Sequence, residues 1–533
     1  MNPTVLIGLD GATFTILDHL MENDTMPFLR EFVRGGVRAK LLSTANPLTP
    51  PAWVSLMTGR SPGHHGVFDF IWAEERDDEV FFTLYNFRDI RCETIWSIVS
   101  RENGKACTLN FPMMSPPPAI SGYVVPGLVS WKHLRRNTYP QQLYDELKAL
   151  PNFDARILAW DFDLEKKAER GVSPEEYESW VNFHILRERQ WFELIRYLMK
   201  QHPCDLTAII FDGVDKILHM GWQFLDPTLQ TSASPTKEKL RALCLQYFRE
   251  LDGFLAEIAH LAGVHALIFM ASDHGFGPSW QVIRVNSWLS AQGYLTWRQF
   301  GELDEAGRES VKRLVEKHFV LLDWDKTTAY ARTATSNGIY IRVAQKPGQT
   351  GISPDRYGSF RGELVEKLLA LSDPESGEPV IKKVLTREEA YPGPHNAQAP
   401  DLTLVMRDHS FISILDKKPV VYRRPYIEGT HYPEGIFLAR GPGIRQGEAL
   451  PPLAIVDVPC ALLYSLGVAV PQDFEGRLPA GMFDRSLLEE CPYRIGAPTL
   501  PPDTYVIQPG KGKELNEEEE IMKQLVALGY IEG

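Results

Sequence analysis

The sequence predicts an α/β fold in which a mostly parallel central sheet is covered by helices on both faces. Residues 5–9, 206–211 and 266–270 form short apolar runs without the polar alternation of a half-exposed strand. Such runs are typical of strands buried on both faces of a parallel sheet. An aspartate follows each run, at Asp10, Asp212 and Asp273. Because open α/β sheets bind ligands at the carboxyl ends of their strands, we expect a functional site at this edge.

Apolar periodicity and turn residues place the other elements along the chain. Helices are predicted at residues 26–34, 52–57, 93–100, 174–199, 247–261, 357–371, 454–466 and 516–528, with another near 308–319. Further strands are predicted at residues 37–42, 106–110, 338–343, 400–405 and 435–439. The pair Asp373-Pro374 ends the helix at 357–371, because the residue before a proline is pushed out of the helical region.

The same pattern divides the chain into a core and insertions. We expect a catalytic core at residues 1–290 and 395–490, a mostly helical insertion at 128–185, a second insertion or cap at 290–395, and a C-terminal tail with a closing helix at 490–533. The insertions are expected to hang over the carboxyl edge of the sheet. They would then determine which substrate is accepted.

Composition limits the classes of protein. The chain has 533 residues, 44% of them hydrophobic and 23% charged, as in a large globular enzyme. Its net charge of −13 argues against a general nucleic-acid binder, which needs a basic stripe. Six scattered cysteines without a CxxC pair fit reduced thiols. With neither a signal peptide nor a long apolar run in evidence, we expect a cytoplasmic protein without a membrane span, and the oligomeric state stays open.

Residues 48–60 are the stretch around which the chain is organised. Pro50 and Pro51 cannot continue a strand but suit the first turn of a helix, and Gly59 is a natural helix end. Thr49 is therefore expected just before a helix, where unpaired backbone N–H groups favour negative charge. A hydroxyl held there can attack phosphorus once it is ionised. Alternatively, Thr49 is only the N-cap of the helix.

Aspartates and histidines recur near the predicted strand ends. Asp215 and His219 are four residues apart and face one side of a helical turn, a common way to hold zinc. Asp273 and His274 follow a buried strand directly and must be paired or liganded, with a buried Asp–His hydrogen bond as the alternative. His431 is expected in a tight loop before a strand, where a plain turn histidine is the alternative.

Two further features have less specific interpretations. Asp10, taken alone, is better explained as a cap of a turn or helix. His64 and His65 could be ligands, but we interpret them as part of a polar turn.

Several pieces of sequence are informative when they are taken in order. They are Gly8-Leu9-Asp10-Gly11, the Thr49 loop ending in Thr58-Gly59-Arg60, Asp215 with His219, Ser272-Asp273-His274-Gly275, and Gly429-Thr430-His431. In this order and spacing they resemble the alkaline phosphatase superfamily, and within it most closely the type I phosphodiesterase/nucleotide pyrophosphatase branch. The resemblance covers most of residues 1–290 and 395–480.

The resemblance implies a three-layer sandwich and two metal ions, usually zinc, on either side of the reacting phosphate. By position, one ion would be held by Asp215, His219 and His431. The other would be held by Asp10, Asp273 and His274, together with the hydroxyl oxygen of Thr49. The implied reaction is attack by Thr49 on phosphorus, which gives a covalent phosphothreonine that water then hydrolyses.

Elementary chemistry agrees with this implication. Two divalent ions about 3.5–4 Å apart stabilise both the attacking and the leaving oxygen. Metal binding lowers the pKa of the Thr49 hydroxyl, so no separate general base is needed. Three aspartates and an ionised Thr49 leave a site with two such ions near neutral. Aspartate and histidine ligands suit zinc well and manganese tolerably.

Departures from related patterns narrow the activity. Sulfatases carry C/S-x-P-x-R at the nucleophile, whereas the aligned residues here are Thr49, Pro51 and Trp53, so sulfatase chemistry by formylglycine is not expected. Cofactor-independent phosphoglycerate mutases use serine. Nucleotide pyrophosphatases place a phosphate-binding asparagine where this chain has Phe70, which cannot donate a hydrogen bond. Asn110 or the Thr49 N–H could take over that role.

These features predict a metal-dependent phosphoric ester hydrolase that acts on a small-molecule diester or nucleotide-type substrate. Phosphomonoesterase and phosphotransferase or mutase activity remain open within the same superfamily. A non-catalytic binding protein of the same fold is a further alternative. It is disfavoured because every metal and nucleophile position carries a chemically competent residue.

Overall fold

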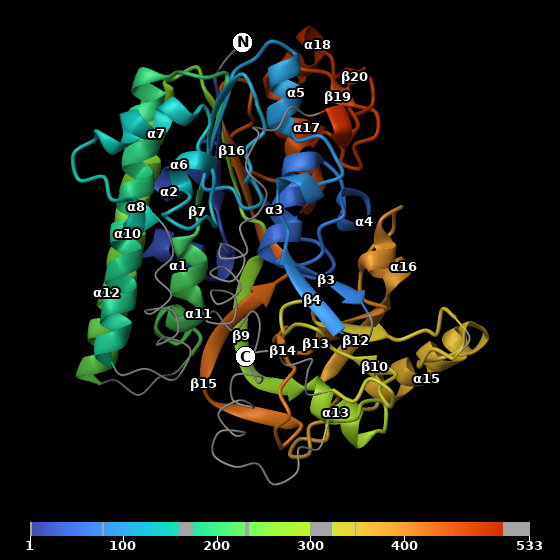
Figure 1. The fold of residues 1–533 in the computed structure, drawn as a ribbon. Coiled ribbons are helices and arrows are strands. Elements are labelled where there is room, and N and C mark those ends of the chain that lie inside the picture. Colours follow the sequence, from blue (N-terminus) through green and yellow to red (C-terminus); the bar gives the residue numbers. More distant parts are fainter. Residues whose placement is uncertain are drawn as a thin grey trace.

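The structure, a computed structural model, describes residues 3–76, 79–158, 174–229, 234–298, 322–346 and 348–504. A large central sheet runs through the upper part of the molecule, with helices on both of its faces (Figure 1). Its strand order is β17-β2-β16-β8-β1-β7-β5-β6, with β18 beside β2. The bounds are β1 (Thr4–Leu9), β2 (Val37–Leu42), β5 (Ala106–Leu109), β6 (Gly122–Val125), β7 (Leu206–Phe211), β8 (Leu267–Ala271), β16 (Glu434–Arg440), β17 (Glu448–Ala449) and β18 (Leu453–Ala454).

Parallel pairing dominates this sheet. β1 pairs in parallel with both β7 and β8, and β5 pairs in parallel with β6 and β7. β16 lies antiparallel between β2 and β8. The predicted class, a mostly parallel α/β sheet between two helical layers, is therefore confirmed. The carboxyl ends of β8, β1 and β7 lie side by side, and each leads into one of the aspartate-bearing turns.

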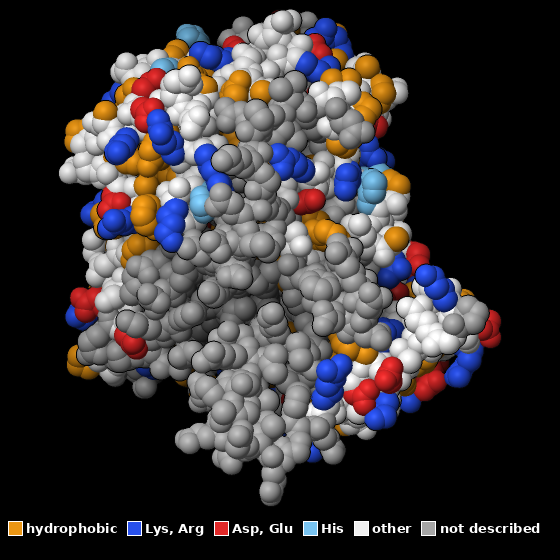
Figure 2. Space-filling view, viewed as in Figure 1, with side chains coloured by type: hydrophobic (Ala, Val, Ile, Leu, Met, Phe, Trp, Pro, Cys, Tyr) orange, Lys and Arg blue, Asp and Glu red, His pale blue; other side chains and the backbone are white. Residues whose placement is uncertain are grey.

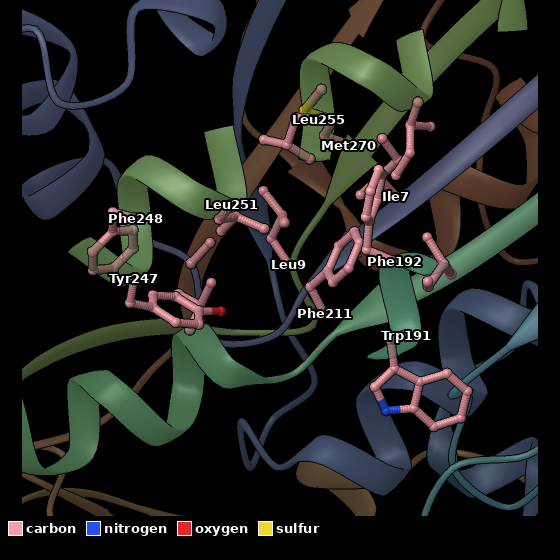
Figure 3. Packing of buried hydrophobic residues seen from close by; sticks show 14 of the residues in the cluster. Ile7, Leu9, Trp191, Phe192, Phe211, Tyr247, Phe248, Leu251, Leu255 and Met270 are labelled. Atoms are coloured by element: carbon pink, nitrogen blue, oxygen red, sulfur yellow. The ribbon is translucent and has the colours of Figure 1, made fainter. Parts of the chain in front are cut away.

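Both faces of the sheet are covered, which explains the unbroken apolar strands. Val5, Ile7 and Leu9 of β1 belong to one core, whereas Leu6 belongs to the other. Figure 3 shows Ile7 and Leu9 packed with Leu251 and other residues of the first core. That core includes residues of α1 (Phe14–Glu22), α2 (Pro27–Arg34), α10 (Pro174–Gln201), α11 (Gly213–Leu225) and α12 (Pro235–Ala262). The second includes residues of α3 (Thr49–Thr58), α5 (Ile95–Arg101) and α17 (Val458–Ser465).

Shorter helices complete the upper part of the molecule. They are α4 (Pro62–His65), α6 (Leu134–Asn137), α7 (Gln141–Lys148), α8 (Ala155–Leu158) and α18 (Arg485–Glu490). The strand pair β19 (Val470–Pro471) and β20 (Ile495–Gly496) lies near α18 (Figure 1). A hairpin of β3 (Ile71–Arg76) and β4 (Glu79–Leu84) follows α4.

A second sheet lies below the central one and, with three helices, forms what we call the cap (Figure 1). Its strand order is β10-β11-β13-β12. The cap consists of α13 (Val285–Ala291), β10 (Ala329–Tyr330), β11 (Gly338–Ile341), α15 (Tyr357–Leu369), β12 (Ile381–Thr386), α16 (Arg387–Ala390) and β13 (Leu402–Met406). The expectation that the core resumes at residues 400–405 is wrong in one respect, because β13 pairs with β11 and β12 rather than joining the central sheet.

Long antiparallel strands connect the core with the cap. β9 (Gly275–Arg284) and β15 (Val421–Tyr432) leave the central sheet together and reach toward α13, with β14 (Ile412–Ser413) beside β9 (Figure 1). His431 lies on β15 opposite Phe276 of β9, so the expectation of a tight loop at His431 is wrong. A sheet partner that lies far away in sequence overrides the local turn signal of Gly429 and Pro433.

Other sequence expectations compare with the structure as follows. The helices expected at 26–34, 93–100 and 357–371 correspond to α2, α5 and α15. α12 begins at Pro235, earlier than the periodicity indicates, and α1 is not anticipated by the sequence pattern. The expected helices near 308–319 and at 516–528 lie outside the described residues.

The exposed surface of the cap carries charges of both signs. Around α15, Figure 2 shows lysine and arginine side chains interspersed with aspartate and glutamate. Lys367 pairs with Glu363 at 2.8 Å and Arg361 with Glu388 at 2.8 Å. Among the described helices, none is both long and apolar enough to cross a membrane.

A buried aspartate fastens the core to the cap. Asp69, which precedes β3, accepts hydrogen bonds from the hydroxyls of Thr333 at 2.6 Å and Thr335 at 2.8 Å. Asn46, in the loop before α3, donates to the carbonyl of Thr335 at 2.9 Å. Burial raises the pKa of Asp69 to about 6, although these hydroxyls and the Phe70 N–H favour the charged form.

This raised pKa predicts a pH-dependent stability difference between the wild type and Asp69→Asn. The folded state binds the proton more tightly than the unfolded state, whose Asp69 has the ordinary pKa of 3.8. Wild-type stability is therefore lost as the pH rises from about 4 to about 6, by about 3 kcal/mol for a shift of about two pKa units. Asp69→Asn cannot ionise, so its stability relative to the wild type should rise by that amount. Urea unfolding across this range measures it, and a constant difference would contradict it.

Candidate metal centre

The site is built where three adjacent parallel strands end. Asp10 follows β1, Asp215 lies in the first turn of α11 after β7, and Asp273 with His274 follows β8. Because β8, β1 and β7 are neighbours, their parallel register brings these side chains to one edge. β15 adds His431 from the cap side. The proposed metal ligands and Thr49 therefore come together from five separate segments of the chain.

The first cluster joins Asp215, His219 and His431. Asp215 Oδ1 lies 3.3 Å from His219 Nε2 and 3.1 Å from His431 Nε2. The two histidine Nε2 atoms are 3.0 Å apart. Asp215 and His431 are buried, whereas the His219 side chain is 26% exposed and forms the open side of the cluster.

The second cluster joins Asp10, Asp273 and His274 beside Thr49. His274 Nε2 lies 3.5 Å from Asp10 Oδ1 and 3.3 Å from Asp273 Oδ2. The Thr49 hydroxyl oxygen is 3.4 Å from the same nitrogen. The clusters are contiguous, because the rings of His274 and His431 stack with centroids 3.6 Å apart.

The donor atoms suit divalent cations. Asp10 Oδ1, Asp215 Oδ1 and Asp273 Oδ2 are buried and accept no hydrogen bond from any described residue. Two ligands about 2.0–2.1 Å from a tetrahedral zinc ion lie ~3.3 Å from each other. The nitrogen–oxygen separations within each cluster, 3.1–3.5 Å, match that spacing. Buried carboxylate oxygens without donors are costly unless a cation compensates them.

The outer ring nitrogens define which histidine atoms face inward. His431 Nδ1 lies 3.0 Å from the carbonyl of Pro47, and His274 Nδ1 lies 3.0 Å from the carbonyl of Gly275. A carbonyl only accepts, so each Nδ1 carries the proton and each Nε2 presents its lone pair to the cluster. Hydrogen bonds from the outer ring nitrogen to a backbone carbonyl orient metal-binding histidines.

Electrostatics gives the same picture. Burial raises the pKa of Asp10 well above its usual range, and Asp273 and Asp215 raise it further. Burial likewise raises the pKa of Asp273 to about 8. Burial also opposes the ionisation of Asp215, but His219 and Lys216 outweigh it and lower its pKa well below the usual value. The protein alone thus supplies too little positive charge to keep all three carboxylates ionised.

Backbone and aromatic groups hold the carboxylates in place. The Trp53 indole N–H of α3 donates to Asp10 Oδ2 at 3.2 Å, and the Gly11 N–H donates to Asp273 Oδ1 at 3.2 Å. Gly8 lets the Trp53 ring approach, since a Cβ there would lie 2.6 Å from Trp53 Cη2. The glycine in the first sequence motif is therefore explained by this close contact.

Thr49 lies one position further into the helix than expected. It is the first residue of α3, and Leu48 occupies the N-cap, so the capping interpretation of Thr49 is wrong. Pro50 and Pro51 have no N–H, which leaves Thr49 as the only donor among the first three helical residues. The hydroxyl of Thr49 instead faces His274.

The cavity at Thr49 is lined by a lysine side chain that sequence reasoning missed. Thr49, Asp10, Phe70 and Asn110 line it together with Lys216. The Lys216 ammonium is buried, 3.1 Å from Asp215 Oδ2. A lysine directly after Asp215 in an otherwise apolar stretch was the available signal. An ammonium here can bind a phosphate oxygen.

The structure shows the surroundings of Phe70, which stands at the position of the usual phosphate-binding asparagine, and of Asn110, a possible replacement. Phe70 does line the Thr49 cavity. Asn110 also faces it, but its amide donates to the carbonyl of Ile210 at 3.0 Å and to Asp212 Oδ1 at 3.2 Å. Both amide hydrogens are thereby engaged, whereas Lys216 and Thr49 line the same cavity.

His64 and His65 lie outside both clusters. His65 is buried, and its Nε2 lies 3.0 Å from the hydroxyl oxygen of Ser55. His64 Nδ1 lies 3.3 Å from Glu475. They are not ligands of the described clusters, but they lie in the short helix α4, with His65 buried, so the expectation of a polar turn is wrong.

With this geometry in view, comparison with known proteins decides the family. The model of the family "Type I phosphodiesterase / nucleotide pyrophosphatase" matches residues 4–433. The chain belongs to this family. It is accordingly a hydrolase of phosphoric esters, and the family depends on metal ions. A search of curated proteins found no match.

Solved structures share the fold at low sequence identity. Human ectonucleotide pyrophosphatase/phosphodiesterase 5 is 12% identical, with 89% of this chain and 97% of that chain covered and a TM-score of 0.50. The murine protein is 14% identical, with 88% and 96% covered and a TM-score of 0.49. Phosphonoacetate hydrolase from Sinorhizobium meliloti 1021 is 16% identical, with 87% and 95% covered and a TM-score of 0.49. The match to the human protein is a likeness of fold.

The contact between Gly8 and Trp53 can be tested by a matched pair of substitutions. Gly8→Ala should lower the free energy of unfolding by about 1–3 kcal/mol, because the new methyl group overlaps Trp53 and Ile210. Gly253→Ala, within α12 and with no atom within 4 Å of a new Cβ, should raise it by about 0.5–1 kcal/mol. Urea unfolding measures both. Equal stability of the two variants would rule out tight packing at Gly8.

Proposed function

We propose that this chain is a two-metal phosphodiesterase in which Thr49 is the nucleophile. The observation that carries the proposal is the pair of contiguous clusters, whose three donor-free carboxylate oxygens and inward imidazole nitrogens lie beside one threonine hydroxyl. We assign one ion to Asp215, His219 and His431. We assign the other to Asp10, Asp273 and His274, with the Thr49 hydroxyl. Zinc fits these ligands best, and manganese is the alternative.

When bound, the metal ions lower the pKa of the Thr49 hydroxyl and balance the charge on the phosphate. Thr49 Oγ1 then forms a bond to phosphorus while the bond from phosphorus to the leaving oxygen breaks, and the hydroxyl proton passes to solvent. Water next attacks the phosphothreonine, breaks its Oγ1–P bond and returns a proton to Thr49. The side chain is thereby regenerated.

Residues of the chain prepare this step. α3 fixes Thr49 at its first position, and its Trp53 holds Asp10 in place one turn later. Lys216 sits in the Thr49 cavity, where we assign it to a phosphate oxygen in place of the donor that Phe70 lacks. Phe70 itself offers an apolar wall to the ester group.

A diester is favoured over a monoester because the cavity wall at Phe70 offers no hydrogen-bond donor. A monoester dianion carries one more negative charge than a diester, and Phe70 gives that charge no donor. The physiological substrate would be a small phosphate ester in the cytoplasm. Transfer of the phosphoryl group to an acceptor other than water is the second candidate within the family.

Turnover of two chromogenic esters tests the proposal. The zinc-reconstituted protein should hydrolyse bis-p-nitrophenyl phosphate faster than p-nitrophenyl phosphate, because the diester needs no extra donor at Phe70. Both rates are followed by p-nitrophenolate absorbance. A faster monoester reaction would replace the proposal by a phosphatase or mutase activity. Absence of both reactions in a protein with two bound ions would favour the transferase.

Variants in the same assay separate the roles of the residues. Thr49→Ala should abolish turnover while the zinc content of the dialysed protein is unchanged, and Thr49→Ser should keep part of it, since it retains a hydroxyl. Asp273→Asn should instead lose bound zinc. Lys216→Met should raise KM for the diester more than it lowers kcat. Wild-type turnover in Thr49→Ala would remove Thr49 from the nucleophilic role.

A further inference from the structure

A second cavity lies between the core and the cap, and no residue of the two metal clusters lines it. It has a volume of about 300 Å³, at the small end of ligand pockets. We call it the cap pocket, and the side chains that matter below are Asp69, Trp72, Tyr85, Arg332, Tyr340 and Arg387. The core contributes the segment around β3, and the cap contributes the loop between β10 and β11 together with α16.

Aromatic rings and guanidinium groups dominate its wall. Arg332 lies over the Tyr340 ring, with its Cζ 3.6 Å from the ring centroid, and its Nε donates to the Tyr330 hydroxyl at 3.0 Å. These two contacts fix the position of the Arg332 guanidinium against the Tyr340 ring. Tyr85 is buried, and Trp72 is half-buried. A flat guanidinium beside aromatic rings is suited to a planar ring that carries a carboxylate or phosphate.

The acidic groups of the pocket are already engaged. Asp69 accepts from two threonine hydroxyls and the Phe70 N–H. Asp401 accepts from Arg387 at 2.7 Å, from the Tyr357 hydroxyl at 2.6 Å and from the Ile341 N–H at 2.7 Å. Protein donors thus satisfy both carboxylates, and the Arg332 side chain lines the same pocket.

The cap pocket is separate from the Thr49 cavity but adjoins it. Phe70 lines the Thr49 cavity, whereas its neighbour Asp69 lines the cap pocket. The pocket is also linked to the loop before α3, because Thr335 bonds both Asp69 and Asn46. A ligand in the cap pocket would thus lie against the same segment that positions Thr49.

We propose that the cap pocket is a second binding site for a small ligand with a planar ring and one anionic group. The ring lies among Tyr85, Tyr340 and Trp72, and the anion pairs with Arg332. Binding requires neither the metal ions nor turnover at Thr49. The proposal can therefore fail or succeed independently of the proposed function.

Calorimetric titration with 1-naphthyl phosphate tests it. Thr49→Ala protein freed of metal with EDTA serves as the receptor, so that the catalytic centre cannot consume the probe. Saturable binding of one molecule is expected, at least tenfold tighter than that of inorganic phosphate or of 1-naphthol. Absence of saturable binding, or equal binding of inorganic phosphate, would overturn the proposal.

Substitutions locate the binding. Arg332→Gln changes the cap side of the pocket and Trp72→Leu changes the β3 side, and each should weaken binding at least tenfold. Arg423→Gln removes an exposed arginine of the ion pair with Glu375 and should leave binding unchanged. Melting temperatures show which variants are folded. If folded Trp72→Leu or Arg332→Gln binds as tightly as Arg423→Gln, the ligand is not in the cap pocket and the proposal is wrong.

Discussion

The burial of three carboxylates at one sheet edge is the constraint on which the rest of the site depends. Asp10, Asp215 and Asp273 lie close together because each follows one of three neighbouring parallel strands, β1, β7 and β8. Each keeps one buried oxygen that accepts no hydrogen bond from the part of the chain that the structure describes. Such an arrangement is costly for a protein unless positive charge is supplied. Lys216 supplies one charge to Asp215, and divalent cations would supply the remainder.

The surrounding structure serves this constraint. His274 and His431 each donate a hydrogen bond from Nδ1 to a backbone carbonyl, and their Nε2 atoms face the carboxylates. Gly8 has no Cβ and so leaves room for the Trp53 ring, whose indole N–H donates a hydrogen bond to Asp10. That same tryptophan belongs to α3, whose first residue is Thr49. Thr49, the nucleophile we propose, and Asp10 of the second cluster are thus positioned by one unit, which favours a reaction that depends on orientation.

Local pattern was sufficient for part of this structure. The four-residue spacing of Asp215 and His219 places both on one helix face, and apolar runs that end in aspartate reveal which strands converge. Long-range pairing was not accessible in this way. His431 lies on β15 because β9 is its partner, and β13 pairs within the cap although its apolar run resembles a core strand. The roles of Lys216 and Asn110 likewise depend on side-chain contacts that only the folded chain defines.

The central claim is that the Thr49 hydroxyl itself attacks phosphorus, and trapping the covalent intermediate tests this most directly. Zinc-reconstituted protein is mixed with excess bis-p-nitrophenyl phosphate, quenched in acid within the first turnovers and digested for peptide mass spectrometry. If Thr49 is the nucleophile, the peptide that contains it carries a p-nitrophenylphosphoryl group, and Thr49→Ala protein shows no modified peptide. Full turnover without a modified Thr49 peptide, or modification at another residue, would contradict the mechanism.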